Sequence, residues 1–341
     1  GGTRTLTGER GPDPRTATLT DIVGAVEAGG SDGPFHFDGS FTIAGQELLL
    51  EVTTGRTAAA AALPLRVTLS LPDRVLGGVT GTAGDGGAGS LRFAGVLDRS
   101  PGTAISGELR GEGRRLGDLT TVLAGLTGRP ASEQSRAGNA RPADTRPWTL
   151  AGQFTWADGR ILLDGLEAAV GDSRAVGSVE IPLQGRDRGR EASLVLSFTA
   201  LDLDDWTGGD VPVLPDGGAL TLDLLADAVT SRGDTLREVS LIGRLADGSL
   251  MVERAAATLP GGLVVEGAGS LSTPAGGLAL DATLTARTEN LRAALTWAGM
   301  WAGMDVAAVP LERLRRAALT TRVQAAAGRG AQARQPPPPR S

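Results

Sequence analysis

The chain has 341 residues, 40% of them hydrophobic, so it is long enough to bury a core in one to three domains. Its 33 basic residues are scattered among 39 acidic ones and the net charge is −6, which argues against nucleic acid as a partner. The absence of cysteine excludes disulfides and thiolate metal sites, and it fits either the cytosol or the periplasm.

The residue usage favours many short strands. Aromatic residues make up only 3% of the chain, whereas Gly occurs 51 times and Pro 19 times, so turn residues recur every few positions. We therefore predict an all-β, mostly antiparallel fold, in which a repeated β-meander forms a long twisted sheet or groove with a few short helices.

In chain order, apolar and polar residues alternate in residues 65–71, 194–198 and 220–224, which predicts half-buried strands. Pairs of Asp and Gly are typical of tight hairpin turns. We expect such turns at three places: Asp38 with Gly39, Asp158 with Gly159, and Asp247 with Gly248.

The chain also resembles itself. Residues 150–181, LAGQFTWADGRILLDGLEAAVGDSRAVGSVEI, recur loosely in residues 241–271 as LIGRLADGSLMVERAAATLPGGLVVEGAGSL. In both places an alternating strand follows, and then a short segment with acidic residues, Leu and Trp. A more distant copy begins at residues 35–41 and ends in a helix-like run to Leu126. Repeats of this kind stack side by side and share one sheet.

We predict five regions from these patterns. They are a β-rich region with a faint first copy (1–127), a flexible linker (128–147), a second β repeat (148–215), a third β repeat with a short C-terminal helix (216–324), and a disordered Pro-rich tail (325–341). The helix is expected where Leu311, Leu314, Ala318 and Leu319 follow helical spacing.

The chain offers little for catalysis. His36 is the only histidine, and we expect it on a sheet face opposite its neighbours Phe35 and Phe37. One histidine cannot form a His-based metal cluster. Ser173 follows Gly and Asp as in some esterases, but no histidine follows it to act as a base, so we predict a turn before a strand.

Other candidate motifs also have plain structural interpretations. The glycine-rich run at 84–89 matches a dinucleotide fingerprint, but a strand rather than a helix follows it, which favours a hairpin tip. Four carboxylates cluster at residues 202–210, without EF-hand spacing: Asp202, Asp204, Asp205 and Asp210. We expect Asp202 and Asp204 on one face of a strand.

Nothing in the sequence pairs Glu167 with Glu180, or Asp158 with Asp164, as acid and base. We therefore predict no enzyme activity, no cofactor, and no catalytic, cofactor-binding or metal-binding residue.

Four segments occur in a characteristic order: FTWADGRILLDGLEAAVGDSRAVGSV at 154–179, TALDLD at 199–204, LPGGLVVEGAGSL at 259–271 and NLRAALTW at 290–297. In this order and spacing they resemble the AsmA family over roughly residues 148–319. The resemblance implies a periplasmic β-rich body anchored in the inner membrane by an N-terminal helix. It also implies roles in outer-membrane assembly, in regulating protein targeting to the membrane, and in phospholipid transport along an apolar β groove.

No stretch of the sequence has the length and hydropathy of a membrane-spanning helix or a signal peptide. The first residue is Gly1 rather than Met, from which we expect an anchoring segment upstream of this chain. The expected partners are phospholipid or outer-membrane assembly components.

Two alternatives stay open at this stage. The aliphatic strip of the sheet is either an open lipid groove or a core sealed by a second layer. The chain could also be a structural β-repeat adhesin or passenger-type surface protein, although its repeat of about 90 residues is long for a solenoid.

Overall fold

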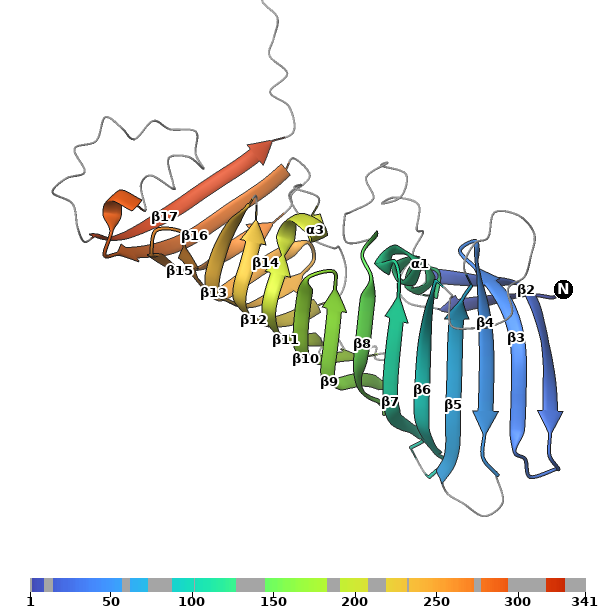
Figure 1. Ribbon diagram of the computed structural model, residues 1–341. Coiled ribbons are helices and arrows are strands. Elements are labelled where there is room, and N and C mark those ends of the chain that lie inside the picture. Colours follow the sequence, from blue (N-terminus) through green and yellow to red (C-terminus); the bar gives the residue numbers. More distant parts are fainter. Residues whose placement is uncertain are drawn as a thin grey trace, which may run out of the picture. The chain divides into compact units, whose positions relative to one another are not determined.

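The computed structural model describes residues 2–8, 15–56, 62–72, 88–100, 102–126, 145–182, 191–207, 219–231, 233–272, 277–293 and 317–328. Strands dominate these residues, and a few short helices accompany them (Figure 1). The predicted all-β fold, a repeated and mostly antiparallel meander, is confirmed. Among the described residues, no helix has the length and apolar character needed to cross a membrane.

The elements follow one another in this order: β1 (Gly2–Gly8), β2 (Arg15–Ala28), β3 (Phe35–Ile43), β4 (Gln46–Thr54), β5 (Ala62–Leu71), β6 (Gly89–Asp98), β7 (Ala104–Gly113), α1 (Leu116–Leu126), β8 (Trp148–Ala157), β9 (Arg160–Val170), β10 (Ser173–Pro182), β11 (Ala192–Asp202), α3 (Leu203–Thr207), β12 (Ala219–Ser231), β13 (Asp234–Ala246), β14 (Ser249–Leu259), β15 (Leu263–Ser272), β16 (Gly277–Thr288) and β17 (Ala317–Gly328). A further helical turn covers residues 291–293.

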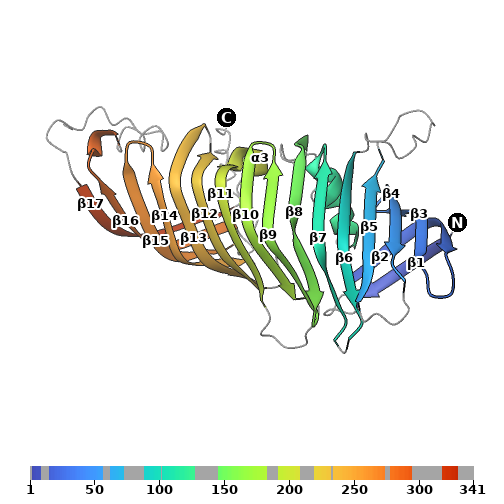
Figure 2. The ribbon, with the colours of Figure 1, turned by 60° about the horizontal axis from the view of Figure 1, so that its bottom comes forward.

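The chain divides into two compact units. The first contains residues 1–211 and 226–234, and the second contains residues 212–225 and 235–341. In the first unit, β1 to β11 pair antiparallel in chain order, each strand with the next. Figure 2 shows β3 to β9 side by side in this order. In the second unit, β13 to β17 pair in the same way.

Tight turns of the same kind join three of the hairpins. Ala44 and Gly45 link β3 to β4, Asp158 and Gly159 link β8 to β9, and Asp247 and Gly248 link β13 to β14. Both residues of every pair have a positive φ, between 48° and 75°, as a two-residue type I′ turn requires. The predicted turns at Gly159 and Gly248 are thus confirmed, and their recurrence supports the repeat.

The turn predicted at Asp38 and Gly39 is wrong, because both residues lie in the middle of β3. Gly39 has a different role there. A Cβ atom at Gly39 would come within 2.7 Å of the Phe37 ring, and one at Gly24 on β2 would do the same. These glycines therefore leave room for the ring against the sheet, which is a common use of glycine inside a strand.

A compact core of the first unit lies beneath α1. The helix packs on β2, β3 and β4, and Val122 meets Ile43, Leu48 and Leu71 there. Leu48 is 0% exposed and both Ile43 and Val122 are 1% exposed. The helix-like run expected to end at Leu126 is confirmed as α1, and Val122 is its buried contribution to this core.

The C-terminal part departs from the sequence prediction. Ala318 and Leu319, expected in a helix, lie in β17, and so do residues 325–328, expected in the tail. Of residues 318–324 only Val323 is half-buried, and continuous pairing with β16 outweighs the local helical spacing. The linker residues 128–144 and most of the predicted helix lie outside the described residues.

A bidentate ion pair fastens β17 to β16. Arg322 donates from Nε and Nη2 to the two oxygens of Asp281, at 2.9 and 2.7 Å, and Gln324 donates to the same carboxylate at 3.2 Å. Hydrogen bonds lower the pKa of Asp281 from 3.8 to about 2, and the bond from Arg322 has a larger effect than the bond from Gln324.

We expect this carboxylate to make the second unit sensitive to acid. Because the folded pKa of Asp281 is depressed, its stabilisation is complete above 3.8 and is lost as the pH falls through about 2. Urea unfolding should show a lower midpoint for Asp281→Asn than for the wild type at neutral pH, and the two midpoints should converge near pH 2. A difference that does not change with pH would contradict this assignment.

Candidate functional site

One face of the first unit is apolar over many strands, and we call it the apolar face. Its residues lie directly opposite one another in the pairing register, so that they form rows across the strands. One row crosses β3 to β7 and another crosses β8 to β11: Phe37, Val52, Val67, Phe93 and Leu109, then Phe154, Leu163, Val179 and Leu194.

The residues of these rows are half-buried. They differ in this from Leu48 and Ile43, which α1 covers completely. Among the described residues, the strands β3 to β11 pack chiefly against their neighbours in the sheet, and α1 packs on β2 to β4. The half-burial of the rows therefore comes from neighbours within the sheet and not from a covering layer of described residues.

The opposite face of the same strands is polar. One step along each strand from the first row, another row of paired residues runs from β3 to β7: Asp38, Glu51, Thr68, Arg92 and Arg110. Side chains alternate between the two faces of a strand, so a single register sorts the residues into two faces of opposite character. We call this second surface the polar face.

Aromatic rings occupy the space beside glycines on the apolar face. A Cβ atom at Gly95 would come within 2.6 Å of Phe93, and one at Gly113 would come within 2.4 Å of Trp148. The Phe93 and Phe154 rings meet edge to face, with their centroids 5.7 Å apart and their planes at 77°. The rings occupy the space that a side chain would take at these glycine positions. This part of the face is therefore an aromatic, apolar surface.

Ser173 connects β10 to the start of α3 through hydrogen bonds. Its side chain is buried, and its Oγ accepts hydrogen bonds from the Asp202 backbone N–H at 3.1 Å and from the Trp206 indole N–H at 3.4 Å. The predicted turn before a strand is confirmed at Gly171 and Asp172. Ser173 is thus a structural acceptor that joins β10 to the start of α3.

Asp202 also has a role that the sequence did not indicate. We expected it to share a strand face with Asp204, but β11 ends at Asp202 and α3 begins at Leu203. The Asp202 carboxylate accepts the backbone N–H groups of Asp204 and Asp205, at 2.9 and 3.2 Å, and so caps the helix. Asn290 caps residues 291–293 in the same manner, through the N–H of Ala293.

Replacing Ser173 by alanine should destabilise the first unit by about 1–3 kcal/mol, because two N–H donors lose their acceptor in a buried setting. Chemical denaturation followed by tryptophan fluorescence measures this loss. Ser178→Ala, on the same strand but opposite Val195 on the polar face, is the matched control and should have little effect. Equal losses in both variants would contradict the structural role of Ser173.

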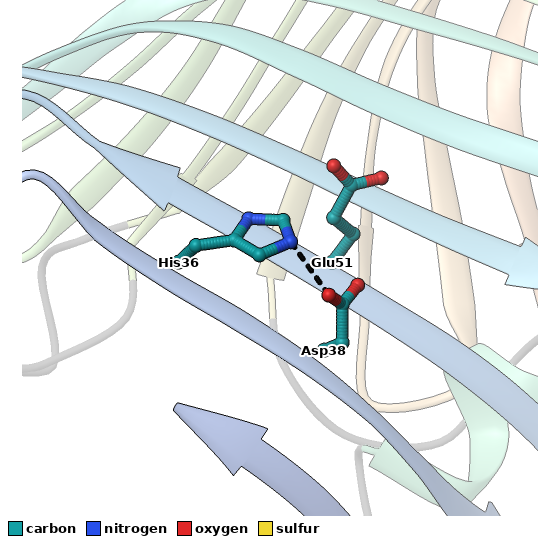
Figure 3. A group of neighbouring side chains, drawn as sticks. All are labelled: His36, Asp38 and Glu51. Carbon is teal, nitrogen blue, oxygen red and sulfur yellow. Dashed lines mark ion pairs between the residues drawn. The ribbon is translucent and has the colours of Figure 1, made fainter. Parts of the chain in front are cut away.

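His36, Asp38 and Glu51 converge on the polar face (Figure 3). His36 lies on the face opposite its neighbours Phe35 and Phe37, as expected. Its Nε2 is 2.5 Å from Asp38 Oδ2, and its Nδ1 is 3.1 Å from Thr53 Oγ1. The ligand atoms of the three residues lie within 4.8 Å of one another. Sequence reasoning missed this group because Glu51 comes from the neighbouring strand.

The other carboxylates considered in the sequence have separate surroundings. Glu180 forms an ion pair with Arg160 at 2.7 Å, and Glu167 lies opposite Val176 in the register. Asp158 is in the turn before β9, and Asp164 lies opposite Gln153. The register thus separates the members of each considered acid–base pair. Asp210 and residues 84–87 of the glycine-rich run lie outside the described residues.

No protein-family model, curated protein or solved structure matches the chain.

Proposed function

We propose that this protein is a non-enzymatic, AsmA-like component of the bacterial cell envelope that holds phospholipid acyl chains against its apolar face. The observation that carries the proposal is the half-burial of the apolar rows without a covering layer of described residues. The order of the AsmA-like segments along the chain adds support.

The chemistry of the apolar face suits an acyl chain. The face offers aliphatic and aromatic side chains in register across β3 to β11, and charged residues such as Glu51 and Arg92 point to the other side. Each methylene that leaves water for such a surface contributes about 0.8 kcal/mol. Several methylenes along one chain thus supply a useful affinity without any specific polar site.

The aromatic surface beside the glycines adds a steric argument for acyl-chain binding. Gly95 and Gly107 lie opposite each other on β6 and β7, and Phe154 pairs with Gly107 from β8. Because Gly95 carries no side chain, the Phe93 ring occupies the space beside it, and the Phe154 ring meets Phe93 edge to face. A flexible hydrocarbon chain can contact such a surface along its length, whereas a rigid polar ligand finds few hydrogen-bonding partners there.

The setting that we propose is the periplasmic side of the inner membrane. In that setting the protein would take part in outer-membrane assembly or in protein targeting to the membrane. These roles rest on the AsmA resemblance of residues 148–319.

Mass spectrometry of bound lipid tests the proposal. The protein is expressed without detergent, purified in folded form and extracted with organic solvent, and the extract is analysed for phospholipid. We expect phospholipid in near-stoichiometric amount. A folded, lipid-free protein that also fails to take up phospholipid from added vesicles would overturn the proposal and leave a purely structural surface role.

A further inference from the structure

The polar face places two like charges directly opposite each other. Asp38 on β3 pairs with Glu51 on β4 in the register, and two residue pairs further along, on the same face, His36 lies opposite Thr53. Like charges in directly opposed positions destabilise an antiparallel pair. On the other side of His36, Glu27 of β2 lies opposite it and adds a third carboxylate to the same face. This part of the face is therefore suited to a positively charged partner.

Thr53 holds the imidazole in a useful orientation. Its Oγ1 lies 3.1 Å from Nδ1 of His36, so a proton on Nδ1 can be donated to the hydroxyl oxygen. Nε2 faces the carboxylate of Asp38, to which it donates its proton in the metal-free ion pair, and Glu51 lies nearby (Figure 3). A bound cation would displace that proton and accept the Nε2 lone pair. A hydrogen bond from the second ring nitrogen is the usual way in which proteins orient a metal-binding histidine.

We infer that His36, Asp38 and Glu51 form a binding site for a divalent transition-metal ion such as Zn²⁺. One imidazole nitrogen and two carboxylate oxygens are ligands that Zn²⁺ accepts, and three protein ligands leave a coordination position for water or an incoming anionic group. The side chains of His36 and Asp38 are 36% and 63% exposed, so an ion can enter from solvent. The ion would also neutralise the opposed charges of Asp38 and Glu51.

The composition of the chain makes the test unusually direct. His36 is the only histidine and the chain has no cysteine, so the usual competing ligands are absent. Protein without a polyhistidine tag, labelled with ¹⁵N at histidine, is titrated with ZnCl₂ and observed by NMR. We expect the Nε2 resonance of His36 to shift on binding while Nδ1 keeps its proton. Isothermal titration calorimetry gives the affinity.

Four variants separate the roles of the residues. His36→Ala and Glu51→Gln should abolish measurable Zn²⁺ binding, and Thr53→Val should weaken it by about tenfold through loss of the orienting hydrogen bond. Glu47→Gln is the matched control, because Glu47 is an exposed carboxylate on the same face of β4, opposite Thr42, and should leave binding unchanged.

Two results would overturn the inference: an unchanged His36 spectrum at a molar excess of Zn²⁺, or equal Zn²⁺ affinity in wild type and His36→Ala. In either case the imidazole itself, as the partner of Asp38, would account for the cluster. This inference does not depend on lipid binding, because the two sites lie on opposite faces of the strands. The Zn²⁺ titration and the lipid analysis can therefore succeed or fail separately.

Discussion

Leu196→Glu is expected to reduce co-purified phospholipid by at least about tenfold. Leu196 lies on the apolar face, opposite Gly177 of β10 and two residues along β11 from Leu194, which belongs to one of the apolar rows. A carboxylate there would have to lose water when an acyl chain covers it, at a cost of several kcal/mol, and every 1.4 kcal/mol weakens binding tenfold. Lipid per mole of protein, measured by mass spectrometry, reports the effect.

The adjacent residue supplies the matched control. Val195 is 44% exposed, and it lies opposite Ser178 on the polar face. Val195→Glu introduces the same charge one position away and should leave lipid binding unchanged. The neutral change Leu196→Gln should give an intermediate loss, and circular dichroism shows whether each variant keeps its strands. Equal lipid content in Leu196→Glu and Val195→Glu would contradict the assignment of the apolar face.

Leu48→Ala should destabilise the first unit by about 2–5 kcal/mol. Leu48 is 0% exposed and packs with Ile43, Leu71 and Val122 beneath α1, so truncation removes apolar contacts and leaves a cavity. Because the chain has two units, the change is best measured locally, by hydrogen exchange of the amides of β3 to β5. A loss of 2 kcal/mol corresponds to about 30-fold faster exchange through global opening.

Leu49→Ala controls for the loss of a leucine at the neighbouring position of β4. Leu49 is half-buried on the polar face, opposite Ser40 and Ser70, and its truncation should cost much less. If Leu48→Ala cost no more than Leu49→Ala, the cluster beneath α1 would not be a core of the first unit.

Local patterns predicted β5, β11 and β12 correctly because their information lies in neighbouring residues. Alternation in residues 65–71 and 194–198 marks β5 and β11, and the turns at Gly159 and Gly248 follow from the positive φ that Gly tolerates. The prediction for β17 failed for the opposite reason. Its helical spacing at Ala318 and Leu319 is weak, and pairing with β16 decides its conformation.

The His36 group shows how one turn controls a candidate site. The predicted turn at Asp38 and Gly39 would place His36 opposite Phe41. Glu51 would then not lie opposite Asp38 or next to His36. The actual turn, at Ala44 and Gly45, places His36 opposite Thr53 and Asp38 opposite Glu51. Asp with Gly is the more favourable pair for such a turn, and Ala44 has a positive φ that is uncommon for alanine, so local preference favoured the wrong register and strand pairing decided the actual one.

The sequence by itself determined the fold class, the alternation of apolar and polar residues, and the recurrence of the hairpins, because these depend on residues close together in the chain. Only the tertiary structure decided which strands align, which residues α1 seals, and which apolar residues it leaves half-buried. Those outcomes depend on the register between strands and on where a helix returns over the sheet. Both are set by contacts between residues far apart in the sequence.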